Sequence, residues 1–153
     1  MRRFIGSFTG ALVLVLVLSS TAAAATPAAM YTQFLSREMA AAAKVLVYAS
    51  DFVDDTDVLN ASGAAVHARQ VVTLASREVA WLNSHTPARC YKNAWTYMRK
   101  GWTEYKKAYQ AANRWLVAYP YGSSTDFQTF VTYNAMGGAS LEKAGYYVDL
   151  TSC

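Results

Sequence analysis

Two copies of one short pattern bring glutamates to positions where they could act together. Ser36-Arg37-Glu38-Met39-Ala40 and Ser76-Arg77-Glu78-Val79-Ala80 each place a glutamate within an apolar face at helical spacing. The two helices should turn around near residue 57, so Glu38 and Glu78 are expected at the same height. Glu142, in a later helix, borders an apolar face near the same end. One hypothesis is therefore a metal or small-cofactor site inside a helical bundle, built on Glu38, Glu78 and Glu142.

The other residues that metal or covalent chemistry needs are missing from this pattern. A di-metal carboxylate bundle uses Glu-x-x-His, and neither His67 nor His85 stands three residues after a glutamate. The chain has no Cys-x-x-Cys-His for covalent haem and no serine or cysteine relay. We therefore expect no catalytic constellation and no cofactor. The glutamates can instead pair with arginine or lysine, or share a proton if they are close and dry.

A second candidate surface is one side of the segment between residues 87 and 119. Its apolar stripe, expected to face the core, consists of Tyr91, Trp95, Met98, Trp102, Tyr105, Tyr109 and Leu116. The opposite side carries Arg89, Lys92, Arg99, Lys100, Lys106, Lys107 and Arg114, and there only Glu104 offsets these cations. A face of this kind attracts an anionic surface polymer, lipid headgroups or an acidic protein. The alternative is a solvated face that acids on neighbouring helices neutralise.

Within this face, the expected principal contacts are Arg99, Lys100, Lys106 and Lys107, with Arg114 beyond them. Tyr97 and Trp115 lie off both the apolar stripe and the basic side. They are expected as exposed rings that extend a binding surface, or as contacts with an adjacent helix. The sequence thus favours a non-enzymatic binding protein, with the internal carboxylate site as the alternative.

The start of the chain predicts export. Arg2 and Arg3 precede an apolar run at residues 11–18, and residues 22–25 are alanines, which is typical of a secretory signal peptide at residues 1–25. The run is too short to span a membrane. Removal of the leader lowers the formal charge from +4 to about +2, which does not indicate nucleic acid as the partner. Residues 26–153 are expected to form one secreted or periplasmic domain without a transmembrane segment.

The elements that must position these side chains are helices. Thr26-Pro27 and Thr86-Pro87 each offer a hydroxyl cap followed by proline, and Thr125-x-x-Gln128 is a capping box. The predicted helices span about residues 27–55, 58–84, 87–119 and 125–150. The first should bury Phe34, Leu35, Met39, Ala42, Val45, Leu46, Ala49, Phe52 and Val53, while Met30, Met98 and Met136 also fill the core. Four such helices with short loops predict an all-α, antiparallel up-down-up-down bundle.

The two cysteines fit this topology. Cys90 opens the third predicted helix and Cys153 ends the chain, which puts both at the same end of an antiparallel bundle. In an exported protein, two cysteines so placed are expected to form one structural disulfide. Gly138 and Gly145 should face the large rings of the third helix, and the pair Gly137-Gly138 could kink the fourth.

Overall fold

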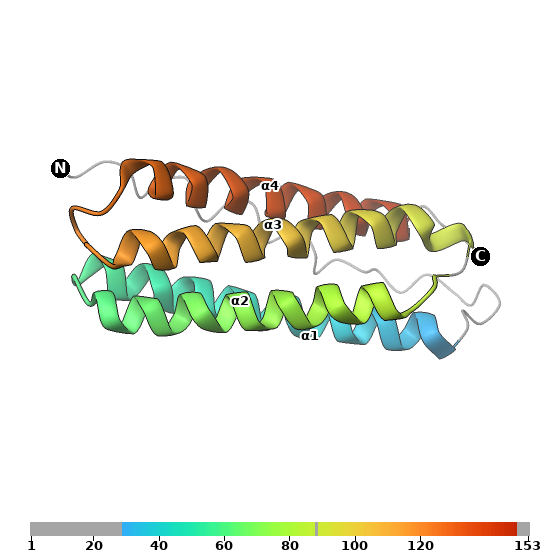
Figure 1. Cartoon of the computed structure of the whole chain (residues 1–153). Coiled ribbons are helices and arrows are strands. Elements are labelled where there is room, and N and C mark those ends of the chain that lie inside the picture. Colours follow the sequence, from blue (N-terminus) through green and yellow to red (C-terminus); the bar gives the residue numbers. More distant parts are fainter. Residues whose placement is uncertain (1–28, 88, 150–153) are drawn as a thin grey trace.

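The protein forms four long helices that lie side by side (Figure 1). The computed structural model describes residues 29–87 and 89–149. Its long helices are α1 (Ala29–Asp57), α2 (Ala61–Ser84), α3 (Lys92–Leu116) and α4 (Ser124–Asp149), and a short 3-10 turn, η2 (Arg89–Tyr91), precedes α3. No strand occurs within these ranges. The predicted all-α fold with four helices is confirmed.

Consecutive helices pack against each other: α1 on α2, α2 on α3, and α3 on α4. Trp95, near the start of α3, donates its indole N–H to the carbonyl of Leu82, near the end of α2, at 2.8 Å. Arg114, near the end of α3, pairs with Asp126, near the start of α4, at 2.9 Å. Because the end of one helix meets the start of the next, neighbouring helices run in opposite directions, as an up-down bundle requires.

The turn before α2 explains why this helix begins later than predicted. Leu59 has a φ of 59°, the left-handed region, which interrupts the helical path after α1. The side chain of Asn60 then accepts a hydrogen bond from the backbone N–H of Gly63 at 3.1 Å and donates one to Asp55 at 2.8 Å. Asparagine is a preferred N-cap residue, so α2 starts at Ala61 instead of Val58.

The ends of α3 and the start of α4 also differ from the prediction. Thr86-Pro87 does not open α3, because η2 intervenes and the helix begins at Lys92. At its other end α3 stops at Leu116, and residues 117–120 form turns. Ser123, not Thr125, caps α4: its Oγ accepts a hydrogen bond from the backbone N–H of Asp126 at 3.3 Å. Serine and threonine are both preferred N-cap residues, so the sequence alone does not choose between Ser123 and Thr125. The turn before α4 places Ser123 at the helix end.

The core is centred on α3, whose predicted apolar stripe is buried. Trp102 is fully buried and Tyr109 is 2% exposed. The ring of Tyr109 meets Phe52 of α1 and Phe130 of α4, with centroids 5.3 to 5.6 Å apart among the three rings. Burial raises the pKa of Tyr105, one turn earlier, to about 12. Side chains of α1 and α4 therefore meet Tyr109 of α3 in the core.

Glycine allows α3 and α4 to approach closely near the middle of the bundle. A Cβ at Gly101 would lie 2.6 Å from Cδ2 of Leu141 and 3.1 Å from the carbonyl oxygen of Gly137. A Cβ at Gly137 would lie 3.2 Å from the ring of Tyr105, whereas one at Gly145 would meet nothing within 4 Å. The glycines that admit the large side chains are thus 101 and 137, and the prediction that Gly145 has this role is wrong. α4 runs through this region as one helix.

α1 is less covered than its sequence predicts. Val45 and Phe52 are buried, but Met39 is 40% exposed and Leu46 is 39% exposed. In α4, Met136, which was also predicted to fill the core, is 41% exposed. The physical reason for α1 is that it packs closely on α2 alone. Met39 and Leu46 therefore lie on a side of α1 that no other helix of the described ranges covers closely.

Some sequence predictions lie outside the described residues and side chains. They concern the predicted leader, residues 1–25, and the side chains of Met30 and Phe34. Cys153 lies outside them as well, so the predicted disulfide with Cys90, which is half-buried in η2, stays a prediction. Among the helices of residues 29–87 and 89–149, none is long and apolar enough to cross a membrane.

Candidate functional site

The cations of α3 form one continuous outward side, which we call the basic face. It consists of the exposed Lys92, Arg99, Lys100, Lys107 and Arg114 and the half-buried Lys106. α3 packs on α2 along one flank and on α4 along the other, so the remaining side of the helix points to solvent. Arg89 of η2 is exposed just before it. The predicted outward position of the candidate binding cations is therefore observed.

The carboxylate expected to offset these cations is turned inward. Glu104 is 5% exposed, and Ser140 of α4 donates a hydrogen bond to its Oε2 at 2.7 Å. Lys100 reaches Glu104 only at 3.9 Å. Arg114 has a closer partner, Asp126, at 2.9 Å. Within the described ranges these are the ion pairs of the basic face, so its middle keeps cations without an acidic neighbour.

Aromatic rings of α3 and α4 flank the basic face. Tyr97 stacks on Tyr147 of α4 with centroids 5.4 Å apart, and Lys143 Nζ lies 4.5 Å from the centre of the Tyr97 ring. Contact with Tyr97 raises the pKa of Lys143. Lys107 Nζ lies 5.3 Å from the centre of the Tyr133 ring. The rings thus contact Lys107 of the basic face and a further exposed cation, Lys143 of α4, which extends the face and which the sequence analysis missed.

Tyr97 and Trp115 are half-buried, and each packs against α4. Trp115 lies 5.0 Å from Phe127 and 4.8 Å from Tyr119 between ring centroids. Of the two roles considered for these residues, contact with an adjacent helix is the one observed. They shape the edge of the basic face and do not project from it.

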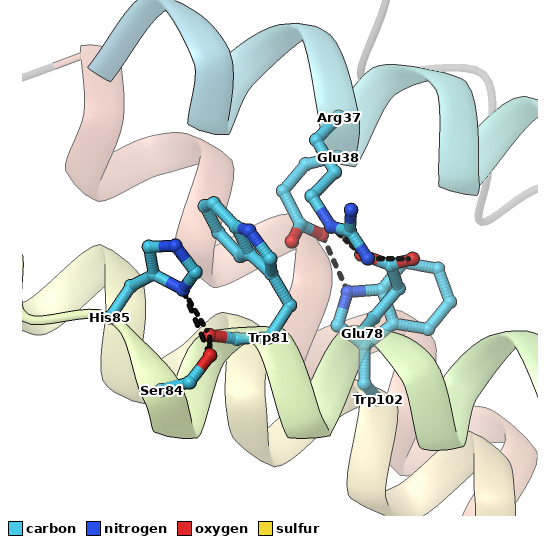
Figure 2. A network of polar contacts seen from close by, with 7 residues as sticks. All are labelled: Arg37, Glu38, Glu78, Trp81, Ser84, His85 and Trp102. Carbon is cyan, nitrogen blue, oxygen red and sulfur yellow. Dashed lines mark hydrogen bonds and ion pairs between the residues drawn. The ribbon is translucent and has the colours of Figure 1, made fainter. Parts of the chain in front are cut away.

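The second candidate site lies inside the bundle, where the two repeated patterns meet. Arg37 of the first pattern binds Glu78 of the second through two hydrogen bonds, at 2.6 and 3.0 Å (Figure 2). The Arg37 guanidinium also lies 5.0 Å from the centre of the Trp81 ring. Glu78 is 4% exposed. The Glu78 carboxylate is therefore paired with an arginine. This is the role that the sequence offered as the alternative to metal binding.

Glu38 lies next to this ion pair and has a different environment. It is 5% exposed, and its Oε2 accepts a hydrogen bond from the indole N–H of Trp102 at 2.5 Å (Figure 2). Its Oε1 is buried and has no hydrogen-bond partner among the described residues. Burial, which outweighs the Trp102 hydrogen bond, raises the pKa of Glu38 to about 8, and the charge of Glu78 adds to the increase. At pH 7 this raised pKa favours the protonated, neutral form of Glu38.

The predicted third carboxylate does not join this site. Glu142 is exposed on α4, whereas Glu38 and Glu78 are buried. Across residues 29–87 and 89–149 there is no group of three or more His, Cys, Asp or Glu side chains that could hold a metal ion. The level positions of Glu38 and Glu78 were predicted correctly. The pairing of Glu78 with an arginine is the alternative that the sequence offered. The hydrogen bond from Trp102 to Glu38 was not predicted, because it depends on how α1 and α3 meet across the core.

A histidine and a serine lie together at the end of α2, but without the geometry of a catalytic pair. Ser84 Oγ is 3.0 Å from His85 Nδ1 (Figure 2). The same Nδ1 lies 2.8 Å from the carbonyl oxygen of Trp81. Because a carbonyl oxygen only accepts hydrogen bonds, Nδ1 must carry a hydrogen to bond with it. Ser84 Oγ donates to that carbonyl as well. His85 therefore does not act as a base toward Ser84 in this arrangement.

Comparisons with models of known protein families, with curated proteins and with solved structures found no match. The function is therefore argued from the basic face and the buried carboxylates alone.

Proposed function

We propose that the protein is a non-enzymatic binding protein whose basic face holds an anionic polymer. One observation carries this proposal: the cations of α3 point outward along the whole helix while its one carboxylate, Glu104, is buried against Ser140. Because the cations point to solvent and Glu104 is buried, the surface of α3 has a positive potential, which attracts polyanions.

The shape of the face favours a linear polymer over a membrane. From Lys92 to Arg114 the cations extend along about 33 Å of helix, at 1.5 Å per residue. The rings beside them are packed into α4, with Tyr97 on Tyr147 and Trp115 on Phe127. Proteins that lie on membranes insert rings and leucines next to their cations, whereas the rings of α3 that border this face, Tyr97 and Trp115, are half-buried. Lipid headgroups are the other partner that the test below distinguishes.

The predicted leader and cysteines indicate where this binding takes place. A signal peptide at residues 1–25 directs the chain to the periplasm or the outside of the cell, so the polymer would belong to the envelope or the medium. In that oxidising space a Cys90–Cys153 disulfide would tie the start of α3 to the end of the chain. It would thereby hold one end of the basic face in place.

The experiment compares two charge-reversed pairs for retention on immobilised polyphosphate and on vesicles containing an anionic lipid. Arg99→Glu with Lys107→Glu alters the basic face, and Arg69→Glu with Arg77→Glu makes the same charge change at exposed positions of α2. We expect the α3 pair to weaken polyphosphate binding by about tenfold or more at low salt and the α2 pair to weaken it by much less. Equal losses would assign the binding to net charge and overturn the proposal. Vesicle binding without polyphosphate binding would assign the face to lipid.

A further inference from the structure

The cations of the basic face occur in groups along α3, and uncharged polar residues lie between the groups. Successive groups begin seven or eight residues apart, at Lys92, Arg99, Lys106 and Arg114. Because each residue advances an α-helix by 1.5 Å, a positive charge recurs about every 10 to 12 Å along the face. On the same side of the helix, between the groups, lie the exposed Thr96 and Gln110 and the half-buried Thr103. The face therefore alternates between cations and uncharged hydrogen-bonding groups.

The two threonines offer hydrogen-bond acceptors to a ligand. Thr96 Oγ1 donates its proton to the backbone carbonyl of Lys92 at 2.9 Å, and Thr103 Oγ1 donates to the carbonyl of Arg99 at 2.8 Å. A hydroxyl has one proton and two lone pairs, so each threonine oxygen can still accept a hydrogen bond. A ligand that uses the whole face must therefore carry anionic groups at wide intervals and hydroxyl donors between them.

We propose that the polymer held by the basic face is an acidic polysaccharide with one acidic sugar in each disaccharide repeat, an inference that rests on the proposed function. In such a polymer an anionic group recurs at every second sugar, an interval comparable with that between the cation groups. The lysine and arginine side chains form charge-assisted hydrogen bonds with the acidic groups. The sugar hydroxyls between them donate to Thr96 and Thr103, and the amide of Gln110 can donate or accept.

Polyphosphate and nucleic acid match this arrangement less well. Along one nucleic acid strand a phosphate recurs about every 3.4 Å, roughly a third of the interval between the cation groups. Polyphosphate has no hydroxyl donors along its chain at neutral pH, so the threonine oxygens would gain no partner from it. Proteins that bind single strands also stack bases on aromatic rings. Tyr97 and Trp115, the rings of α3 that border the face, are instead half-buried against α4.

The test measures binding of hyaluronan, which has one carboxylate in each disaccharide, and of polyphosphate to the protein expressed from its complete coding sequence. Thr96→Val with Thr103→Val removes the two acceptors and changes no charge. We expect this pair to weaken hyaluronan binding by about fivefold or more and to leave polyphosphate binding unchanged. Thr129→Val is the matched control, because Thr129 of α4 donates its hydroxyl to the carbonyl of Thr125 at 2.8 Å in the same way. It should alter the binding of neither polymer.

A relocated charge tests the spacing of the cations. Lys107→Gln combined with Gln110→Lys keeps the net charge and moves one cation by about 4.5 Å along the helix. This change should weaken hyaluronan binding by about threefold or more and leave polyphosphate binding unchanged, because polyphosphate has a charge within reach of either position.

The outcomes separate this inference from the proposed function. A threonine pair or a relocated charge that leaves hyaluronan binding intact, or that weakens both polymers equally, would overturn the polysaccharide assignment while the polyanion site remains. Tighter binding of single-stranded DNA than of hyaluronan would overturn it as well and assign the face to nucleic acid. A wild-type protein that binds neither hyaluronan nor polyphosphate at low salt would overturn the proposed function itself.

Discussion

The indole N–H of Trp102 donates a hydrogen bond to Oε2 of Glu38, which joins α3 to α1 across the centre of the bundle. Trp102 is fully buried and Glu38 is 5% exposed, so neither group has water as an alternative partner. An ionised carboxylate in this position would be costly, since no donor in the described part of the chain reaches Oε1. Protonation of Oε1 removes the charge and leaves Oε2 as the acceptor for Trp102.

Glu38 should make the protein less stable as the pH rises. The pKa of Glu38 is raised from 4.5 to about 8 in the folded protein. Between these values the folded state binds more protons than the unfolded state, so the contribution of Glu38 to the free energy of unfolding falls by up to about 1.4 kcal/mol per pH unit. It is complete below pH 4.5 and lost above about pH 8. Glutamine resembles the protonated acid and does not titrate.

We therefore expect Glu38→Gln to match the wild type near pH 5 and to exceed it in stability near pH 8. Urea denaturation of both proteins at the two pH values measures this difference. Glu142→Gln, an exposed change on α4, is the control and should follow the wild type. A Glu38→Gln variant with the same pH dependence as the wild type would show that Glu38 is ionised in the fold.

Arg37 should stabilise the fold because it pairs with the carboxylate of Glu78, which is buried. Removal of the guanidinium by Arg37→Met leaves the carboxylate of Glu78 without its two hydrogen bonds. We expect a loss of about 3 kcal/mol in the free energy of unfolding, measured by denaturation. Glu78→Gln in the Arg37→Met background should recover much of that loss, since it removes the uncompensated charge. Arg77→Met is the control from the second repeat. Failure of Glu78→Gln to recover stability would mean that Arg37 acts by packing on Trp81.

Substitution of Gly101 and of Gly145 by alanine should change the free energy of unfolding in opposite directions. Gly101→Ala places a methyl group against Leu141 and the carbonyl of Gly137, and it should lower the free energy of unfolding by about 1 to 3 kcal/mol. Gly145→Ala adds a methyl group in open space within α4, and it should raise stability by about 0.5 to 1 kcal/mol because alanine favours helix. Thermal denaturation of both variants measures this. A stabilising Gly101→Ala would contradict the close approach of α3 and α4.

The predicted disulfide can be read from the mass of the exported protein. The intact mass should correspond to a chain that begins at residue 25 or 26 and lacks two hydrogens, and a reducing agent should restore them. Reduction should lower the free energy of unfolding by about 4 kcal/mol, since the disulfide closes a long loop. Cys90→Ser should reproduce the effect of reduction. A mass that matches two free thiols would remove the disulfide.

The sequence predicted best what depends on periodicity within one helix. The apolar stripe from Tyr91 of η2 to Leu116 of α3 is buried as expected. Seven apolar positions at helical spacing lie on one side of a helix, and that side must face the core. The level positions of Glu38 and Glu78 followed from the shared turn near residue 57. Helix ends were less accurate, because Ser123 and Thr125 both satisfy the capping rule and only the turn geometry selects between them.

What periodicity could not predict is which helices meet across the bundle. Met39 and Leu46 have the spacing of core residues, yet both are exposed because α1 packs closely on α2 alone. Glu104 lies at the border of the basic side on a helical wheel, and it is buried because Ser140 of α4 reaches it. Lys143 joins the basic face from another helix, through Tyr97. Each of these depends on a contact between segments far apart in the sequence.

The most direct test of the basic face is the salt dependence of polyphosphate binding. The logarithm of the association constant should fall linearly with the logarithm of salt concentration, because each phosphate contact releases a counterion. Neutralising two contacts, by Arg99→Gln with Lys107→Gln, should make this slope shallower by about 1 to 2. Arg69→Gln with Arg77→Gln on α2 should leave the slope unchanged. The same slope for the wild type and the α3 pair, or an equal change for the α2 pair, would contradict the assignment of binding to α3.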